Sequence, residues 1–311
     1  MHKLTLKIIY IVGFLTLTLG AYSFLSSSTQ LNELSELADN KEKPVLFVPP
    51  NTPSELVIFR EKMPLEYPDV YESFDREIFT NCYYHSSSIR ILKLIPRYQP
   101  IIMPILEEEG VPGDFFYLAV AESALDPSAV SASGAVGLWQ FMKQTAIEFG
   151  LEVNDDIDER YHAEKATRAA CRYLKASYER FGSWTLVAAA YNAGNAGIER
   201  QITRQNQKNY YDLLLNSETA RYVFRIAALK TILESPVNYG FSIPEDVQYK
   251  AWKTREIQVS GSIADLASWS EEQGTNYKIL KTLNPWLRQI NLANKLGKTY
   301  IIKLPLKGER I

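Results

Sequence analysis

The sequence of 311 residues predicts a mainly α domain followed by a small domain with the order β-α-α-β. Between Val70 and Leu233, apolar residues recur mostly at helical spacing. Beyond Pro236, two short runs that alternate apolar and polar residues flank two short helical patterns. A formal net charge of -2 offers no polycationic face for nucleic acid, so we expect a neutral or weakly charged partner.

The N-terminal residues 1–25 are typical of an export signal. Lys3 and Lys7 precede an apolar run, residues 8–25, and a serine-rich stretch follows it. Small residues near the end of the run favour cleavage, yet the uncut run is also just long enough to span a bilayer. We therefore expect a signal peptide or a signal anchor, with a buried core helix as the alternative. No cysteine lies near the run, which excludes a lipid anchor on cysteine.

Residues 26–68 are rich in Glu, Asn and Pro and predict a linker, or an extended strap along the domain that follows. The two cysteines, Cys82 and Cys171, lie far apart and outside any CxxC or Cys/His cluster. Their spacing predicts neither a metal site nor a disulfide framework, and it leaves one bridge or two buried thiols open. We expect no metal and no organic cofactor.

Residues 87–110 combine helical spacing of apolar residues with three prolines, Pro96, Pro100 and Pro104. Because an interior proline lacks the amide hydrogen and clashes with the preceding turn, we expect two or three short helices that meet at angles. Pro112 then opens a helix over residues 115–124, and an Asp-Pro pair closes it.

Glu122 occupies an apolar position of that helix. Its spacing from Leu118 and Ala119 places it on their stripe, in the last turn. Desolvation and the exposed carbonyl groups of the helix end both disfavour a negative charge there, so the pKa of Glu122 is predicted to be raised. A carboxyl group that stays protonated near neutral pH can act as a general acid. The alternative is a side chain that reaches the surface or pairs with Arg90 or Arg97.

The segment 128–136 consists almost entirely of Ser, Ala and Gly, which suits a loop that lets a bulky ligand approach the backbone. Gly137 leads into the stretch GLWQFMKQTAIEFG, for which we predict an amphipathic helix that ends at Gly150. The first turn of this helix would present Trp139 and Gln140, an aromatic ring and an amide of the kind that bind sugar rings.

Two further helices are predicted over residues 163–181 and 184–191, separated by a Gly-Ser pair that serves as stop signal and N-cap. Three alanines in the second helix permit close packing, and an Asn/Gly turn follows it. Tyr191 and Asn192 therefore end a tightly packed helix. Taken alone, they would be interpreted as a core tyrosine and a turn asparagine.

The chain contains, in this order, the segments AESALDP, GAVGLWQFM and AAAYNAG. Their sequences and separations resemble three signature blocks of the lysozyme-like (SLT-type) lytic transglycosylases, enzymes that cleave peptidoglycan. A later segment, SETARYVFRIAALK, resembles the fourth block. The resemblance extends from about Tyr71 to Leu233 and is strongest to the branch of membrane-bound lytic murein transglycosylase D. It implies an α+β lysozyme-like catalytic domain, at residues 69–238, and a periplasmic location with or without a membrane anchor.

The resemblance implies roles residue by residue. Glu122 matches the single catalytic acid/base of the family, and Tyr222 matches the tyrosine close to it. Ser123 matches a serine that helps orient the acetamido group of the substrate. The other matches are to residues of the substrate cleft: Gln140, Met142, Tyr191 and Asn192. Lys143 departs from the pattern, because many relatives have proline there.

The implied reaction uses one carboxyl group twice. Glu122 would protonate the glycosidic oxygen between N-acetylmuramic acid and N-acetylglucosamine, with an oxocarbenium-like transition state at the muramoyl anomeric carbon. The carboxylate would then take the proton of that sugar's own C6 hydroxyl, which closes a 1,6-anhydro ring. Because the hydroxyl is held beside the reacting carbon, no second carboxylate is needed.

Two other functions stay open. A goose-type lysozyme shares the fold and the acid but adds water, and four residues could supply its second carboxylate: Asp126, Glu148, Asp155 and Asp156. A non-catalytic wall-binding protein would use the cleft for recognition only. An intact Glu122 disfavours that function, because a buried acid costs desolvation and gives a binding protein nothing.

The C-terminal β-α-α-β pattern, at residues 254–306 after a linker at 239–253, resembles a LysM module, a small peptidoglycan-binding domain. The match is degenerate, because Gly261-Ser262-Ile263 stands where a Gly-Asp-Thr sequence is usual. If the module binds glycan strands, the candidate contacts are Trp269, Asn284 and Trp286. Ordinary packing is the alternative for all three.

Overall fold

The computed structural model of the chain describes residues 49–309. Every described helix and strand lies within one compact unit, Pro50–Ile311. The apolar run of residues 8–25, which predicts the export signal, lies outside the described residues. Among residues 49–309, no helix combines the length and the hydropathy that a bilayer span requires.

A short hairpin lies within the segment that was predicted as a linker or strap. Strands β1 (Leu56–Ile58) and β2 (Glu61–Met63) pair antiparallel. Phe59 begins the turn between them with a left-handed backbone (φ 55°), yet its ring, Ile58 and Met63 are fully buried. This part of the segment therefore belongs to the hydrophobic core and is not a free linker.

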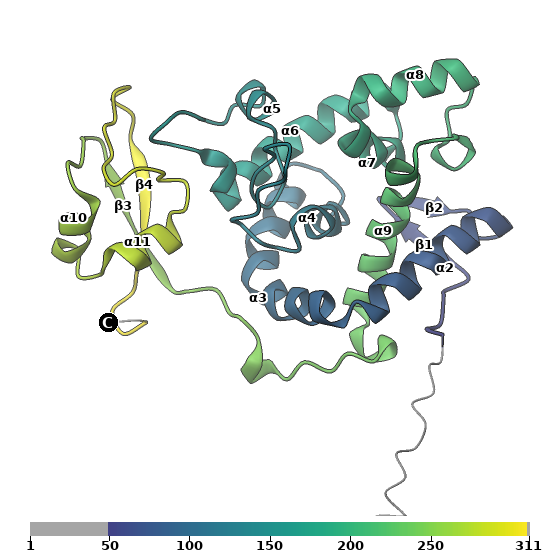
Figure 1. Cartoon of the computed structure of the whole chain (residues 1–311), viewed down its shortest axis with the longest axis horizontal. Helices are drawn as coiled ribbons and strands as arrows, with labels where there is room; N and C mark the ends of the chain where they lie inside the picture. The colour runs from purple at the N-terminus through teal and green to yellow at the C-terminus, as the bar shows by residue number, and fades with distance from the viewer. Residues whose placement is uncertain (1–48, 310–311) are drawn as a thin grey trace, which may run out of the picture. The chain divides into compact units, whose positions relative to one another are not determined.

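Helices predominate in the rest of the first domain, with loops between them (Figure 1). The mainly α character that the sequence predicts is confirmed. In chain order the helices and 3-10 turns are α2 (Pro68–Tyr83), α3 (His85–Glu108), α4 (Phe115–Ser123), α5 (Lys143–Glu148), η1 (Glu159–Tyr161), α6 (Ala163–Phe181), α7 (Trp184–Ala193), α8 (Asn195–Gln205), η2 (Tyr210–Asp212), α9 (Ser217–Glu234), η3 (Pro236–Tyr239) and η4 (Glu245–Val247).

Helix α3 continues through all three of its prolines, so the prediction of two or three short helices is wrong. The prolines are spaced four residues apart and therefore share one face of the helix. Pro100 and Pro104 are exposed, so water can satisfy the carbonyl groups that lose their amide partners. The opposite face is packed into the core through Ile91, Leu94, Ile102 and Ile105.

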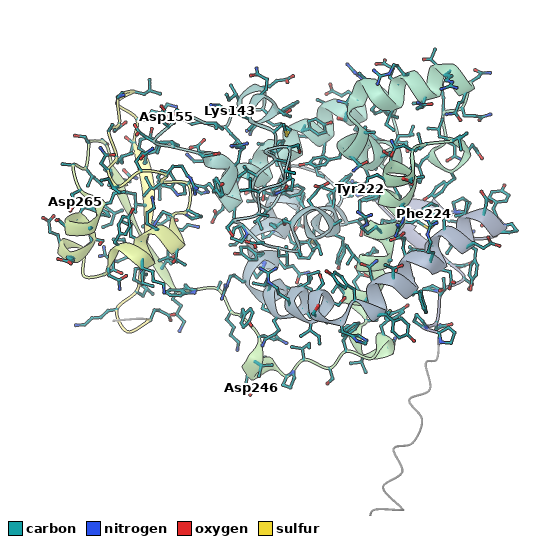
Figure 2. The ribbon with its side chains drawn as sticks, in the orientation of Figure 1. Lys143, Asp155, Tyr222, Phe224, Asp246 and Asp265 are labelled. Atoms are coloured by element: carbon teal, nitrogen blue, oxygen red, sulfur yellow. The ribbon has the colours of Figure 1, made fainter. Side chains whose placement is uncertain are left out.

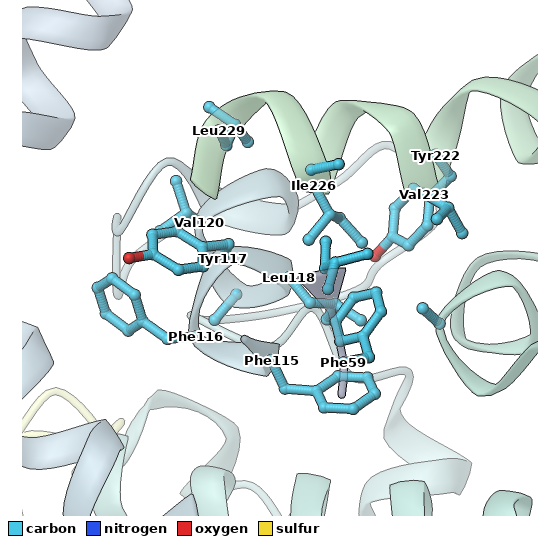
Figure 3. Close-up of a cluster of buried hydrophobic side chains, with 14 of the residues drawn as sticks. Phe59, Phe115, Phe116, Tyr117, Leu118, Val120, Tyr222, Val223, Ile226 and Leu229 are labelled. Carbon is cyan, nitrogen blue, oxygen red and sulfur yellow. The ribbon is translucent and has the colours of Figure 1, made fainter. Parts of the chain in front are cut away.

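Helix α4 is the central helix of this domain. Every residue from Phe115 to Val120 is buried, so α4 is apolar around its whole circumference and not along one stripe only. Helix α9 packs against α4, and also against α2 and α7. Figure 3 shows Tyr222 and Ile226 of α9 directed toward Leu118 of α4. The last turn of α4 is therefore held on a rigid support.

The helix pair predicted on either side of the Gly-Ser sequence is confirmed as α6 and α7. Gly182 ends α6 in the left-handed conformation (φ 67°), and Ser183 Oγ accepts the Leu186 amide as the N-cap of α7. Glu61 of the hairpin accepts the first two amides of α7 at 2.6 and 3.1 Å. A carboxylate at this end complements the helix dipole and ties the hairpin to α7.

The small C-terminal domain has the predicted β-α-α-β order: β3 (Thr254–Val259), α10 (Leu266–Glu272), α11 (Tyr277–Leu283) and β4 (Tyr300–Pro305). The two strands pair antiparallel, with Ile257 opposite Ile302. Their shared core includes Leu266, Leu280, Leu292 and Leu304. The predicted limits of the domains and of the linker between them stay predictions.

Candidate active site

Glu122 lies in the last turn of α4, where the chain leaves the core. The helix ends because Ala124 and Leu125 take left-handed conformations, with φ of 49° and 57°. The side chain of Glu122 is half-buried, and its Oε1 atom accepts a hydrogen bond from the hydroxyl of Tyr222. The predicted alternative partners are engaged with other groups, because Arg90 pairs with Asp126 at 3.5 Å and Arg97 donates to the Lys250 carbonyl.

The environment of Glu122 favours its neutral form. Burial raises the pKa of its carboxyl group, as the sequence predicts. The hydrogen bond from Tyr222 and the charge of Arg225 lower this pKa, and the charge of Glu218 raises it. Burial outweighs the others, so the pKa of Glu122 stays above its ordinary value.

Tyr222 supplies a hydroxyl that keeps its proton. Its side chain is 2% exposed, and burial, together with the charge of Glu122, raises its pKa well above the usual range. The phenol therefore acts as a hydrogen-bond donor to Glu122 throughout the physiological pH range. Figure 2 shows Tyr222 and Phe224 on the same helix, α9, which places the hydroxyl from a fixed backbone.

The end of α7 brings Tyr191 and Asn192 to the same region. Burial raises the pKa of Tyr191 well above its usual range, and the charge of Glu122 adds to this effect. The Tyr191 hydroxyl donates to the Trp139 carbonyl at 2.7 Å. Asn192 Oδ1 accepts a hydrogen bond of 2.9 Å from Thr219, on the first turn of α9. Three helices, α4, α7 and α9, thus converge at the carboxyl group.

The loop of residues 128–142 differs from its prediction. A helix begins only at Lys143, so Trp139 and Gln140 precede it and do not form its first turn. Trp139 is fully buried, and its indole N–H donates to Thr167 Oγ1 at 2.9 Å. The expected open aromatic face is therefore absent at this position. The backbone bridge between Val136 and Phe141 explains the difference, because it folds the loop back on itself.

The remaining predicted cleft residues lie at the edges of this loop. Gln140 has a left-handed backbone (φ 47°), and its amide donates to the carbonyl groups of Ala129 and Gly137. Met142 is exposed, and Lys143 follows it as the first, exposed residue of α5. The Ser123 hydroxyl is buried and donates to the Ala119 carbonyl within α4.

The predicted contact residues of the C-terminal domain lie mostly inside it. Asn284 is fully buried and makes three hydrogen bonds, two of them to the backbone of Lys303. Trp286 is 3% exposed and stacks between His162 and Tyr300. Trp269 is half-buried against the same core. The burial of Asn284 does not support a glycan contact there, whereas Trp269 keeps an accessible side.

No carboxylate proposed for a hydrolase acts on Glu122. Asp126 accepts hydrogen bonds from Ser128 and pairs with Arg90. Figure 2 shows Asp155 well apart from Tyr222, the partner of Glu122. The carboxylate whose charge acts on Glu122 is Glu218, which also pairs with Arg225 at 3.0 Å. The sequence alone indicates no role for this pair, although both residues lie in the fourth block with Tyr222.

The described residues give no sign of a metal site or a disulfide. Between residues 49 and 309, no three side chains of the metal-binding types gather in one place. Cys82 and Cys171 are both free and buried. Burial raises the pKa of their thiols to about 11 and about 12, so both stay protonated.

Two protein families match parts of the chain. The family described as "Transglycosylase SLT domain" matches residues 99–214, and the "Soluble lytic transglycosylase C-terminal LysM-like domain" matches residues 255–308. These matches confirm the resemblance seen in the sequence. They also agree with the predicted fold class, a lysozyme-like domain of mainly α structure with a LysM-like β-α-α-β domain after it.

Curated relatives also match parts of the chain. "Membrane-bound lytic murein transglycosylase D" of Escherichia coli (strain K12) is 28% identical over 202 residues, which cover 63% of this chain and 44% of the relative. "Peptidoglycan transglycosylase gp16" of Escherichia phage T7 is 36% identical over 104 residues, 32% of this chain and 8% of the relative. The chain thus spans less than half the length of either relative.

Two solved structures also resemble the chain. The lytic transglycosylase Slt from Pseudomonas aeruginosa covers 50% of it with 20% identity and a TM-score of 0.36, over 27% of its own length. The 70 kDa soluble lytic transglycosylase from Escherichia coli covers 50% with 21% identity and a TM-score of 0.39, again over 27% of its own length.

Proposed function

We propose that this chain, which carries an SLT transglycosylase domain and a C-terminal LysM-like domain, is a lytic transglycosylase that cleaves the glycan strands of peptidoglycan. The observation that carries the proposal is the pairing of a half-buried Glu122, whose pKa is raised, with the hydroxyl of Tyr222. The bond cleaved is the β-1,4 bond from N-acetylmuramic acid to N-acetylglucosamine.

The surroundings of Glu122 suit an acid that later becomes a base. Burial favours the protonated carboxyl group, which transfers its proton to the glycosidic oxygen as the bond to the muramoyl anomeric carbon breaks. The hydrogen bond from Tyr222 favours the carboxylate that this transfer leaves. That carboxylate takes the proton of the C6 hydroxyl, whose oxygen closes the 1,6-anhydro ring. No water is consumed, and the proton taken replaces the one given.

Substrate-binding roles follow the same proposal. We assign glycan binding to Gln140 and Met142 of the loop, to Tyr191 and Asn192 at the end of α7, and to Ser123, which follows Glu122 on α4. The chain would act outside the cytoplasm, with residues 8–25 as a cleaved signal or an anchor. Peptidoglycan strands are the only partner that the proposal requires.

Mass spectrometry of the products released from peptidoglycan sacculi tests this function. The chain from residue 26 onward is compared with its Glu122→Gln variant. Products that end in 1,6-anhydromuramic acid, lighter by one water than lysozyme products and lacking with the variant, are expected. Products with a reducing end would indicate a goose-type hydrolase. Retained sacculus binding without any release would indicate a recognition protein.

A further inference from the structure

The segment of residues 152–164 contacts both the LysM-like domain and the loop beside Glu122. At its centre Ile157 is 1% exposed and packs into the core of the LysM-like domain. Ile157 also forms a backbone bridge with Leu287, and the neighbouring Asp158 amide donates to the Trp286 carbonyl at 2.9 Å. The first domain therefore completes the core of the second.

Two residues after Asp158, Arg160 reaches the loop of residues 128–142. Its guanidinium is nearly fully buried and forms two parallel hydrogen bonds to the Asp158 carboxylate, at 2.9 and 2.7 Å. The remaining nitrogen, Nη1, donates to the carbonyl groups of Gly134 and Phe141 at 3.1 and 3.2 Å. Only the planar, forked guanidinium can make all of these bonds at once.

The backbone of Arg160 also contacts this loop. Gly137 has φ of 80°, and a Cβ atom there would lie 2.2 Å from the Arg160 carbonyl oxygen. The loop thus contacts Arg160 through a carbonyl on each side of Gly137 and through Gly137 itself. Gln140 and Met142, to which the proposed function assigns substrate contacts, follow directly. A shift of Arg160 would therefore move both side chains.

We propose that Arg160 is a positioning residue for glycan binding, and that docking of the LysM-like domain fixes it through Asp158. The LysM-like domain then promotes cleavage by holding the loop of residues 128–142 in place, independently of any glycan contact of its own. The inference rests on the proposed function, because the loop matters only if its residues bind the glycan.

Polar contacts around this docking segment hold the two domains together. Lys298 and Tyr300 reach Glu152 at 2.9 and 3.2 Å, and Lys303 pairs with Glu164. Burial alone would raise the pKa of Glu164, but hydrogen bonds from His162 and Lys303 lower it to about 2. The Glu164 carboxylate therefore stays charged at any pH at which the enzyme would be assayed, and the charges of this pair can be exchanged by mutation.

The first test measures binding of an N-acetylglucosamine tetramer by calorimetry, in a Glu122→Gln background where nothing is cleaved. Arg160→Ala is expected to weaken binding about tenfold, because the loop loses its fixed position. Arg160→Lys should recover part of the loss, since it keeps the charge but not the fork. Arg168→Ala is the matched control, because Arg168 is exposed on α6 and, among residues 49–309, forms ion pairs only with Glu108 and Glu109.

Kinetics on soluble glycan strands separate positioning from stability. In the active background, Arg160→Ala should raise KM while the pH profile of kcat stays unchanged, because the contact between Glu122 and Tyr222 is untouched. A purely structural role would lower Tm and the active fraction, with KM unchanged in the protein that remains folded. That result, or parental tetramer affinity in Arg160→Ala, overturns the proposal.

Charge reversal at the contact between Glu164 and Lys303 tests the role of LysM-like domain docking without a change at Arg160. It remains a test of the proposal even if Arg160→Ala does not fold. Glu164→Lys and Lys303→Glu each place like charges at the interface and should raise KM about threefold to tenfold. The double exchange should restore the parental KM. Unchanged KM in both single variants contradicts the role of docking. If the parent chain releases no product from sacculi, the proposed function has failed instead.

Discussion

Glu122 and Asn284 both lie at the end of a helix, but their hydrogen-bonding surroundings differ. Around Glu122, Tyr222 donates to a carboxyl group that stays half-exposed, and the effect of burial on its pKa is only partly offset. Around Asn284, every polar atom of the side chain bonds to the domain's own backbone, at 2.7 to 2.9 Å. Every polar atom of the Asn284 side chain is thus bonded within its domain, whereas the carboxyl group of Glu122 keeps hydrogen-bonding capacity at an accessible position.

Trp139 and Trp286, two tryptophans of the family-like segments, are also packing residues. Trp139 lies in the second family block, yet it is fully buried and donates to Thr167. Trp286 fills the boundary between the two domains, stacked on His162. Neither ring is free to lie along a sugar. In both domains, the motif therefore includes residues that pack inside the fold.

The largest expected effect is the loss of cleavage in Glu122→Gln. Removing a general acid typically costs about 10²–10⁴-fold in rate, and the same group would also act as the base, so we expect the upper end of that range. Release of anhydro-ended products from sacculi measures it. Glu148→Gln, on the exposed side of α5, is the matched control and should retain parental turnover. If both variants lose cleavage to the same extent, Glu122 has no special role in the reaction.

Asn284→Ala should act on stability and not on binding. It leaves the amide and carbonyl of Lys303 without their partner, and each buried polar group left unpaired costs about 1–3 kcal/mol. Denaturant unfolding, followed by tryptophan fluorescence, checks the loss. Thr282→Ala on the exposed face of α11 is the control. Parental stability combined with weaker sacculus binding would show instead that Asn284 contacts glycan.

Tyr222→Phe should change how activity depends on pH. The hydrogen bond from Tyr222 lowers the pKa of Glu122, so its removal raises that pKa further. The limb of the kcat profile on which Glu122 loses its proton should move to higher pH, while kcat falls about tenfold because the carboxylate loses a donor. Tyr117→Phe, which removes a buried hydroxyl on α4 bonded to Glu234, should leave the profile in place. A shift of this limb to lower pH would contradict the conclusion that the hydrogen bond from Tyr222 lowers the pKa of Glu122.

The fold was predictable where local signals agree with the tertiary packing. Gly182 and Ser183 fixed the boundary between α6 and α7, because a left-handed cap and an N-cap have strong local preferences. The prolines of α3 wrongly predicted breaks in the helix, because burial of the opposite face stabilises α3 more than the few missing hydrogen bonds destabilise it. The hairpin at residues 56–63 could not be predicted from the sequence, because strands of three residues are too short to show a periodic pattern.

The site was predictable as a set of residues but not as a network. The position of Glu122 on an apolar stripe indicated its raised pKa from helical geometry alone. The influence of Glu218 and Arg225 on that pKa depends on how α9 packs against α4, which no local pattern encodes. The link from Arg160 to the loop beside Glu122 is equally non-local, since it spans 26 residues to Gly134.

The smallest expected effect is on stability, and it has opposite signs for two glutamates. The folded state raises the pKa of Glu122, so it binds this proton more tightly than the unfolded chain does, and its stability falls as pH rises through the interval between the two pKa values. Glutamine does not ionise, so Glu122→Gln removes this loss of stability and should raise Tm at neutral pH. The increase should disappear when the pH is below the pKa that Glu122 has in the unfolded chain. Each tenfold difference in proton affinity corresponds to about 1.4 kcal/mol.

Glu109 provides the opposite case within the same domain. The hydrogen bond from Lys175 lowers its pKa, so Glu109→Gln should lower Tm at neutral pH, and this loss should shrink as the medium becomes acidic. Calorimetric scans of both variants between acid and neutral pH make the measurement. If the change in Tm relative to the parent depends on pH in the same way for both variants, burial does not raise the pKa of Glu122 in the folded state. The two glutamates would then not differ in the direction of their pKa shifts.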